Sequence, residues 1–140
     1  MPELSRSEKD YMEAIYILTK RSGSVRSIDV ASYMDHSKPS VTKAVQNLCA
    51  KGYLLKIDHD LVFTDSGKAV AENIFERHCI LAHALREMGI DEPTAVKDAQ
   101  SMERVISDEA VAITANAIRC QKRLTGVCLA PLDMIGTLCG

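Results

Sequence analysis

Hydrophobic residues recur at helical spacing through much of the chain, and the pattern is clearest in residues 37–54. In this stretch the apolar positions, three or four residues apart, are Val41, Ala44, Val45, Leu48 and Cys49. Ser37 is suited to cap the helix, Pro39 fits its first turn, and Gly52 favours a left-handed end. The pattern therefore predicts a helix that packs along one face and leaves a polar face free.

Two shorter periodic stretches precede this helix. The first predicts a helix from Ser5 or Ser7 to about Lys20, and the RSGS sequence after it is typical of a turn. Ser27 is predicted to cap a second, short helix that ends at Met34. Together with residues 37–54 these stretches predict a helix-turn-helix, in which the third helix is the recognition helix.

The hydrophobic pattern changes after the recognition helix. YLLKI and LVFT are two short β-type runs, and the polar residues Asp58, His59 and Asp60 separate them. A hairpin is expected here, as the wing of a winged helix-turn-helix. Because no Lys or Arg lies between Asp58 and Thr64, contacts of this hairpin with phosphate would be limited to the backbone or His59.

Helical periodicity returns in the second half and predicts helices over about 64–88, 93–107 and 107–123. Their inner faces offer more apolar surface than one small core needs, which favours self-association. The predicted fold is therefore mainly α: a winged helix-turn-helix over 1–72, followed by an all-helical dimerisation domain over 73–140.

The charge distribution distinguishes the two halves. The whole chain of 140 residues has a net charge of −2, but residues 20–56 hold seven basic and two acidic residues, a local charge of +5. Residues 73–140 hold seven basic and nine acidic residues. A basic region over the helix-turn-helix is typical of DNA binding.

We expect the protein to be cytoplasmic. No apolar run approaches the roughly 20 residues of a membrane span, and the polar N-terminus is unlike a signal peptide. Five cysteines, an odd number without a CxxC spacing, predict reduced thiols and argue against both a disulfide framework and a zinc finger.

Small hydroxyl and basic residues gather at the start of the recognition helix, which is the part that enters the major groove in such motifs. We expect Ser37, Pro39, Ser40 and Thr42 to contact bases or backbone of an operator. Contacts with phosphate or guanine are expected from Lys38 and Lys43, and Arg26 would anchor the flanking backbone. The alternative is a solvated surface of a helical bundle.

Five segments in order carry a resemblance to a known family: DYMEAIYIL, SKPSVTKAVQNLCAKGYL, LVFTDSGK, ERHCILAHAL and MERVISDEAV. Over residues from about 8 to 122 the chain resembles the DtxR/MntR family of metal-dependent transcriptional repressors. The resemblance implies a homodimer, a double-stranded DNA operator, and a divalent metal at the junction of the two domains. The chain looks like the short, manganese-regulator type without the SH3-like domain.

The resemblance also implies metal ligands. Asp10 and Glu13 match the acids of the family's first helix, and His78 matches the histidine of its fourth helix. In the E-x-x-E-H cluster of the fifth helix, Glu103 matches the second Glu, whereas Gln100 stands where the family has the first Glu and offers one neutral carbonyl oxygen. Carboxylate oxygens with one imidazole are suited to Mn(II) or Fe(II).

The third position of that cluster departs from the family pattern. Arg104 stands where the family has His, and a guanidinium has no lone pair with which to bind a metal. One hypothesis is that an Arg104 salt bridge to the nearby carboxylates replaces part or all of the metal switch. Another is a changed metal site that uses Cys79, His83 or Asp98 and prefers zinc, cobalt or iron.

Three further alternatives are a site built from cysteines, an enzyme, and a protein-interaction module. Cys128 and Cys139, together with Cys79 or Cys120, would suit a thiolate metal site or a redox bridge if the C-terminal segment brought them together. An enzyme is disfavoured because the sequence has no nucleophile elbow and no phosphate-binding glycine loop. A protein-interaction module that has lost DNA binding is disfavoured by the basic, hydroxyl-rich start of the recognition helix.

Overall fold

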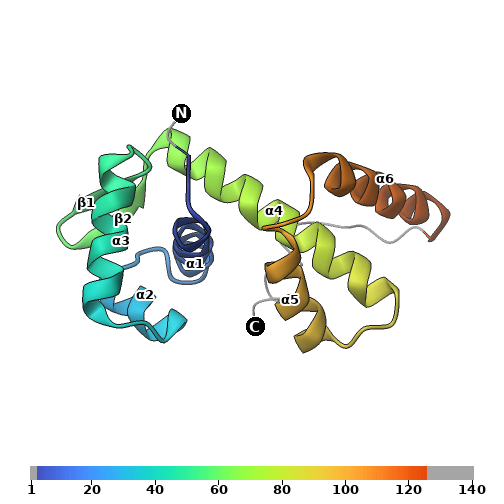
Figure 1. The fold of residues 1–140 in the computed structure, drawn as a ribbon, viewed down its shortest axis with the longest axis horizontal. Helices are drawn as coiled ribbons and strands as arrows, with labels where there is room; N and C mark the ends of the chain where they lie inside the picture. The colour runs from blue at the N-terminus through green and yellow to red at the C-terminus, as the bar shows by residue number, and fades with distance from the viewer. Residues whose placement is uncertain (1–2, 126–140) are drawn as a thin grey trace. The chain divides into compact units, whose positions relative to one another are not determined.

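The computed structural model describes residues 3–125, which form six helices and one two-stranded sheet within that range (Figure 1). They divide into two compact units, and the boundary falls inside the fourth helix between Ile74 and Phe75. The first unit is a winged helix-turn-helix and the second is all helical, which confirms the predicted fold class. The helices are α1 (Arg6–Ser22), α2 (Ser27–Met34), α3 (Lys38–Ala50), α4 (Asp65–Glu87), α5 (Glu92–Met102) and α6 (Asp108–Thr125).

Side chains fix the starts of the first helices largely as the sequence predicts. The Ser5 hydroxyl accepts the Glu8 backbone N–H at 3.2 Å, and the Glu8 carboxylate accepts the Ser5 N–H at 2.8 Å. The Ser37 hydroxyl accepts the Ser40 N–H at 3.3 Å and starts α3. Such reciprocal and single caps satisfy backbone donors that a helix N-terminus leaves without partners.

The predicted cap of α2 is wrong. Ser27 is the first helical residue, and Arg26 occupies the capping position with extended backbone. The Asp29 carboxylate accepts the Arg26 backbone N–H at 2.8 Å, so an acid within the first turn provides the side-chain contact. The cap moved by one residue because this carboxylate reaches back to the residue before Ser27.

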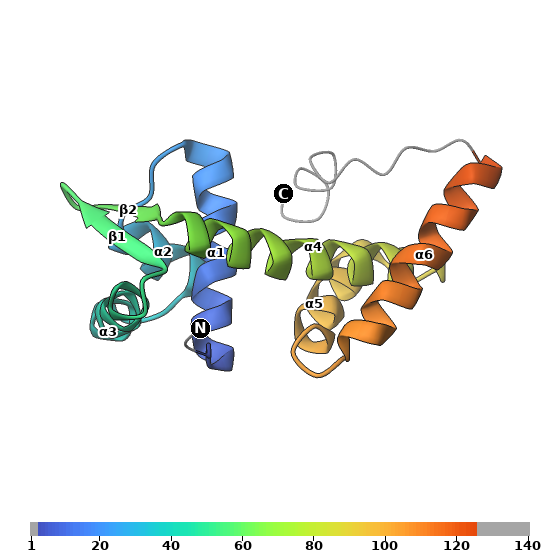
Figure 2. The ribbon, with the colours of Figure 1, turned by 90° about the horizontal axis from the view of Figure 1, so that it is seen from above.

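The hairpin consists of β1 (Leu54–Ile57) and β2 (Asp60–Phe63), which pair antiparallel from Leu54 opposite Phe63 to Ile57 opposite Asp60 (Figure 2). Asp60 belongs to the second strand, so only Asp58 and His59 form the turn. Both have positive φ, at 49° and 73°. Two left-handed residues match the type of two-residue turn that follows the natural twist of a hairpin.

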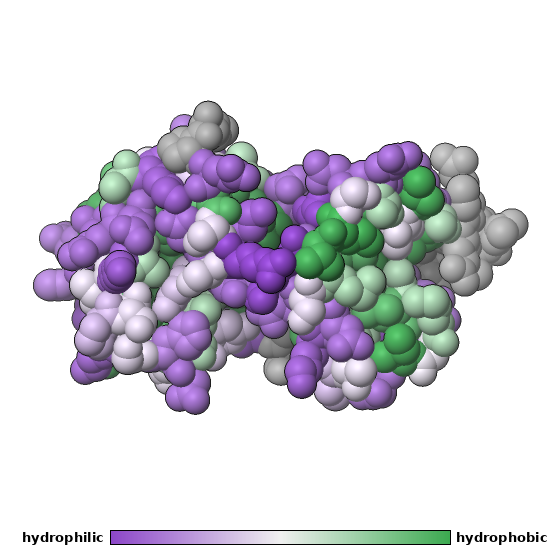
Figure 3. Space-filling model, viewed as in Figure 1, coloured by the Kyte–Doolittle hydropathy of each residue, from purple (hydrophilic) through white to green (hydrophobic). Residues whose placement is uncertain are grey.

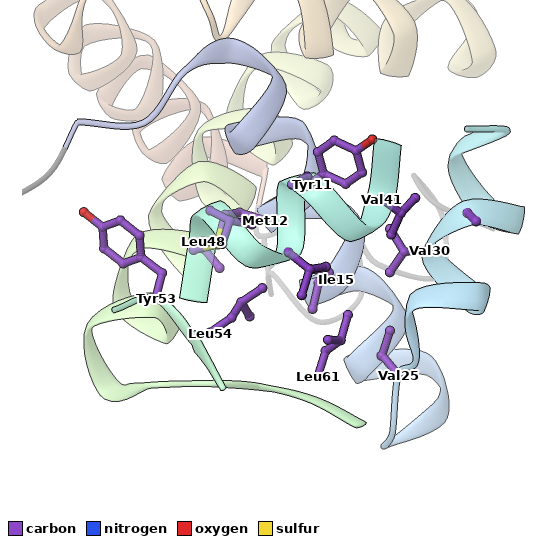
Figure 4. Packing of buried hydrophobic residues seen from close by; sticks show 14 of the residues in the cluster. Tyr11, Met12, Ile15, Val25, Val30, Val41, Leu48, Tyr53, Leu54 and Leu61 are labelled. Carbon is purple, nitrogen blue, oxygen red and sulfur yellow. The ribbon is translucent and has the colours of Figure 1, made fainter. Parts of the chain in front are cut away.

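The core of the winged-helix unit lies where α1, α3 and the hairpin meet. Met12 and Ile15 of α1, Leu48 of α3, and Leu54 and Leu61 of the hairpin point toward one another (Figure 4). All five are nearly or completely buried. This packing fixes which face of α3 is left exposed.

Gly67 lets the start of α4 approach Tyr53, the residue before β1, closely. A Cβ added at Gly67 would lie 1.9 Å from the Tyr53 carbonyl oxygen, which is far inside van der Waals contact. The Thr64 backbone N–H donates to the same carbonyl at 3.1 Å. Any side chain at Gly67 would therefore push α4 away from the winged-helix core.

The helical unit contains the rest of α4, α5 and α6. Gly89, with φ of 97°, follows α4 as predicted, and Asp91 caps α5 by accepting the Thr94 N–H at 3.4 Å. Ser107 caps α6 through the Ala110 N–H at 3.1 Å. The buried apolar residues of the helical unit are Phe75, Cys79, Leu81, Ala82, Leu85, Ala95, Ala99, Val111 and Ile118.

The prediction that one helix runs on to Ser107 is wrong, because α5 ends at Met102. The backbone N–H groups of Val105 and Ile106 both donate to the Met102 carbonyl, at 3.0 and 2.9 Å, and form a turn. Periodicity alone could not locate this end, since the apolar residues of the turn keep helical spacing. No helix within residues 3–125 is both long and apolar enough to cross a membrane.

Candidate nucleic-acid interface and metal centre

The predicted DNA-contacting residues lie on the exposed surface of the winged-helix unit. Ser37, Lys38, Pro39, Ser40, Thr42 and Lys43 are all exposed and occupy the cap and first turns of α3. The opposite face of the helix is buried, with Val41 and Leu48 inaccessible to solvent. The structure therefore gathers six predicted residues on one helix end, at the position from which a recognition helix reads a groove.

Several of these hydroxyls also make local hydrogen bonds. The Ser37 hydroxyl donates to the Ser40 hydroxyl at 2.8 Å, and the Thr42 hydroxyl donates to the Lys38 carbonyl at 2.9 Å. A hydroxyl that donates locally keeps lone pairs for further donors. The residues thus both stabilise the helix start and retain hydrogen-bonding capacity toward a ligand.

Arg26 lies beside the hairpin. Its Nε is 3.5 Å from an Asp60 carboxylate oxygen, and the two side chains are 62% and 39% exposed. An exposed pair of this kind contributes little stability. Arg26 is therefore accessible to an outside anion such as a phosphate.

Two polar contacts fasten α1 to the two ends of α3, and sequence reasoning missed both. Tyr11 Oη and His36 Nδ1 are hydrogen-bonded at 2.8 Å, just before the helix begins. At its other end, Lys51 donates to the Glu8 carboxylate at 2.7 Å and to the Glu3 carbonyl at 2.9 Å. These partners are 25 to 48 residues apart, so no local pattern could reveal them.

Two residues of α1 have shifted pKa values, Tyr11 through burial and Glu8 through burial and its hydrogen bonds. Burial raises the pKa of Tyr11 and keeps its hydroxyl protonated. Burial also opposes ionisation of Glu8, but the hydrogen bonds from Lys51 and Ser5 outweigh it and lower the pKa of this carboxyl. Glu8 therefore stays charged beside Lys51 at neutral pH.

An open groove of mixed polar and apolar lining runs between the start of α1 and α3. Its polar lining includes Ser7 of α1 with the capping residue Ser5, and Ser40, Lys43 and Asn47 from α3. The polar face of the recognition helix thus continues onto the N-terminal end of α1. The sequence placed these residues on two separate helices and gave no sign of their common surface.

Within the helical unit, the structure brings together two of the predicted metal ligands. His78 Nδ1 of α4 lies 3.9 Å from Glu103 Oε2, and the two side chains are 2% and 6% exposed. Glu103 is the C-cap residue directly after α5, and the Phe75 ring stacks on His78 with centroids 6.5 Å apart. A buried imidazole beside a buried carboxylate is donor chemistry that suits Mn(II), Fe(II) or Zn(II).

The other predicted ligands differ from one another in burial. On α1, Asp10 is half-buried and Glu13 is buried, one helical turn apart. Gln100 is exposed on α5, and Arg104 is half-buried in the turn after it. The residues that fit a cation by burial and donor type are therefore Asp10, Glu13, His78 and Glu103.

The thiol and histidine alternatives find less support. Cys79 is buried on α4, and His83 on the same helix has its Nε2 3.8 Å from the Glu87 carboxylate. Burial lowers the pKa of His83, Glu87 raises it and Arg86 lowers it, with a net decrease. Asp98 is exposed on α5.

Cys49 offers little to a thiolate site. Burial raises the pKa of the Cys49 thiol, against a smaller opposing effect of Lys56, so the thiol is poorly reactive. The side chain of Cys120 and the whole of Cys128 and Cys139 lie outside the described residues.

Two family models match the chain in succession. Residues 3–58 match "Iron dependent repressor, N-terminal DNA binding domain", and residues 64–118 match "Iron dependent repressor, metal binding and dimerisation domain". Together the two matches take in most of the described residues, and each falls mainly on one of the two units.

Solved structures share the fold. The manganese regulator SloR is 22% identical with a TM-score of 0.69, over 80% of this chain and 53% of that chain. IdeR of T. acidophilum is 22% identical with a TM-score of 0.70, over 84% of this chain and 55% of that chain. The hypothetical protein SSo2273 of Sulfolobus solfataricus is 23% identical with a TM-score of 0.61, over 82% of this chain and 89% of that chain. The chain thus spans about half the length of SloR and IdeR.

Proposed function

Because the chain belongs to the iron-dependent repressor family, which includes the DtxR and MntR regulators, we propose that it is a homodimeric, sequence-specific DNA-binding repressor controlled by divalent manganese or iron. The observation that carries the proposal is the pairing of two features on the two matched domains. One is the exposed, hydroxyl-rich and basic start of α3, and the other is the buried His78–Glu103 pair.

In this proposal the start of α3 enters the major groove of an operator. Ser37, Pro39, Ser40 and Thr42 contact bases or backbone, and Lys38 and Lys43 contact phosphate or guanine. Arg26, exposed beside the hairpin, binds the flanking backbone. The local charge of +5 over residues 20–56 supplies the attraction that does not depend on sequence.

Asp10, Glu13, His78 and Glu103 would hold the metal, and Gln100 would join them only if its amide turned inward. A bound divalent cation would balance the negative charge of its carboxylate ligands. Metal binding would require the ionised form of Glu103 and the neutral form of His78, because these forms offer a lone pair. Arg104 offers none, and it leaves the ligand set one imidazole short of the family pattern.

The helical unit is the proposed dimer contact. On the face in Figure 3, hydrophobic residues gather over the helical unit, whereas hydrophilic residues cover most of the winged-helix unit. Val105 and Ile113 are 71% and 61% exposed in the single chain. Covering such residues would stabilise a twofold dimer that presents two recognition helices to two half-sites. We place this dimer in the cytoplasm, with its DNA.

The test is fluorescence anisotropy on DNA from upstream of the protein's own gene, under reducing conditions. We expect binding with Mn(II) or Fe(II) and its loss after chelation. Glu103→Gln should lose the metal response, whereas Glu109→Gln, which removes an exposed acid of α6, should keep it. Equal binding with and without metal would contradict metal control, and no binding in either condition would contradict the proposed DNA target.

A further inference from the structure

Arg77 of α4 holds the connection between α5 and α6 at three points. Its guanidinium donates to the Asp108 carboxylate, to the Glu103 carbonyl at 3.2 Å and to the Ile106 carbonyl at 3.0 Å. The Arg77 side chain is only 18% exposed. All these partners lie in the helical unit, and none is close to Arg77 in sequence.

These contacts supply hydrogen-bond donors to carbonyls of the turn after α5. The last carbonyls of a helix have no intrahelical partner, and the carbonyls of Glu103 and Ile106 lie at and just beyond the end of α5. A planar guanidinium presents several donors in a fixed arrangement, so it can hold two carbonyls and a carboxylate together. Arg77 thereby fixes where α5 stops and α6 begins.

Arg77 and His78 are consecutive residues of α4 that both approach Glu103. Arg77 holds the Glu103 main-chain carbonyl, and His78 lies 3.9 Å from the Glu103 carboxylate. When the backbone of Glu103 is held in place, its carboxylate can take only a few positions relative to His78. One turn of α4 therefore supplies both the residue that holds Glu103 and the histidine beside its carboxylate.

We propose that Arg77 is a positioning residue for the metal centre, which holds Glu103 within reach of His78 and ties both to the start of α6 through Asp108. This inference rests on the proposed function. Arg77 is not a ligand, because a guanidinium has no lone pair. It acts on the metal through Glu103, as a neighbour that orients a ligand.

Removing the Arg77 guanidinium should lower metal affinity strongly and the stability of the fold only slightly. The carbonyls of Glu103 and Ile106 can turn to water, so the turn survives but samples more arrangements. Loss of a group that orients a ligand typically lowers metal affinity by roughly 10- to 100-fold. The Asp108 contact alone involves an exposed carboxylate, so its loss should have a smaller effect.

The experiment titrates Mn(II) into the full-length protein and follows the free-ion signal by electron paramagnetic resonance. Arg77→Met should bind Mn(II) roughly 10- to 100-fold more weakly than the wild type, while Asp108→Asn and Arg77→Lys show smaller losses. Lys97→Met, which removes an exposed positive charge from α5, should bind as the wild type does. Thermal unfolding of each variant shows that the titrations are made on folded protein.

A double-mutant cycle separates positioning from general stabilisation. If Arg77 acts through Glu103, Arg77→Met should cost little further affinity in a Glu103→Gln background. Additive losses would overturn the positioning role, as would unchanged affinity of Arg77→Met or, if that variant does not fold, of Arg77→Lys and Asp108→Asn. If the wild type itself binds no Mn(II) or Fe(II), the proposed metal control fails and the role of Arg77 fails with it.

Discussion

The winged-helix unit and the helical unit build their functional surfaces in different ways. In the first, six of the seven predicted DNA contacts lie within residues 37–43 on one helix start. In the second, His78 belongs to α4 and Glu103 caps the end of α5, so the two side chains meet through the packing of separate helices. A surface made from one helix depends on local periodicity and caps, whereas a site made from two helices depends on how those helices pack.

The two units also differ in how well their residues suit the proposed roles. The start of α3 has hydroxyl and basic residues suited to a DNA-reading helix, and all are exposed. The helical unit has Gln100 on an exposed surface and Arg104 in the turn after α5. We therefore expect DNA binding to tolerate little change in the first unit, and metal affinity to have room for improvement in the second.

The largest expected effect tests the packing that orients α3. Leu48→Ala removes a completely buried side chain from the winged-helix core and should lower the free energy of unfolding by about 2–5 kcal/mol. Leu55→Ala, on a half-exposed strand position, should change it by less than about 0.5 kcal/mol. Urea denaturation measures both, and equal losses would mean that Leu48 does not anchor the recognition helix.

A change at residue 104 should bring the ligand set of the helical unit closer to the family pattern. Arg104→His replaces a positive group without a lone pair by an imidazole, and should raise Mn(II) affinity on the order of tenfold or more, about 1.4 kcal/mol. Isothermal titration with Mn(II) measures the gain, with Arg86→His on α4 as the control. Unchanged affinity would place residue 104 outside the coordination sphere.

Loss of a single charge from the recognition helix should act on DNA binding alone. Lys43→Ala should weaken operator binding by about 1 kcal/mol and reduce the slope of log affinity against log salt by about one. Lys68→Ala, an exposed position of α4, is the matched control. Anisotropy titrations between low and moderate salt measure the slope, and an unaltered slope would remove Lys43 from the phosphate contacts.

The contact that fastens α1 to the end of α3 should depend on pH. The pKa of Glu8 is lowered in the folded protein, so its charged form stabilises the fold above its ordinary pKa. That stabilisation is lost as the pH falls through the lowered value. Glu8→Gln should therefore cost about 1 kcal/mol at pH 7 and almost nothing in strong acid.

Denaturation of the wild type and Glu8→Gln across this pH range measures the difference between them. Glu72→Gln, which alters an exposed acid of α4, serves as the control. A difference that stays constant with pH would show that the Glu8 charge contributes nothing through Lys51.

The smallest expected effect concerns the hairpin turn. His59 has φ of 73°, a left-handed conformation that glycine adopts more readily than histidine. His59→Gly should stabilise the winged-helix unit by at most about 1 kcal/mol. Thermal unfolding measures the gain, and Leu55→Gly on the neighbouring strand should destabilise instead. If His59→Gly also weakens DNA binding, the histidine contacts phosphate as the sequence allowed.

The sequence by itself determined the elements and the exposed face of α3. Apolar spacing predicted the buried side of α3, and Ser5, Ser37 and Ser107 marked three helix starts correctly. Such features depend on residues within one or two helical turns, so a local pattern contains the necessary information. The family resemblance added the pairing of His78 with Glu103, which periodicity could not.

Only the tertiary structure decided where α5 ends, which residues hold that end, and how α1 is fastened to α3. Arg77 reaches its partners across 26 to 31 residues, and Tyr11 reaches His36 across 25. Each of these contacts depends on how separate helices pack, and the same side chains would satisfy a local pattern in many other arrangements. Proximity between distant residues is a result of packing, and for that reason the sequence named the metal-ligand candidates but not the arginine that positions one of them.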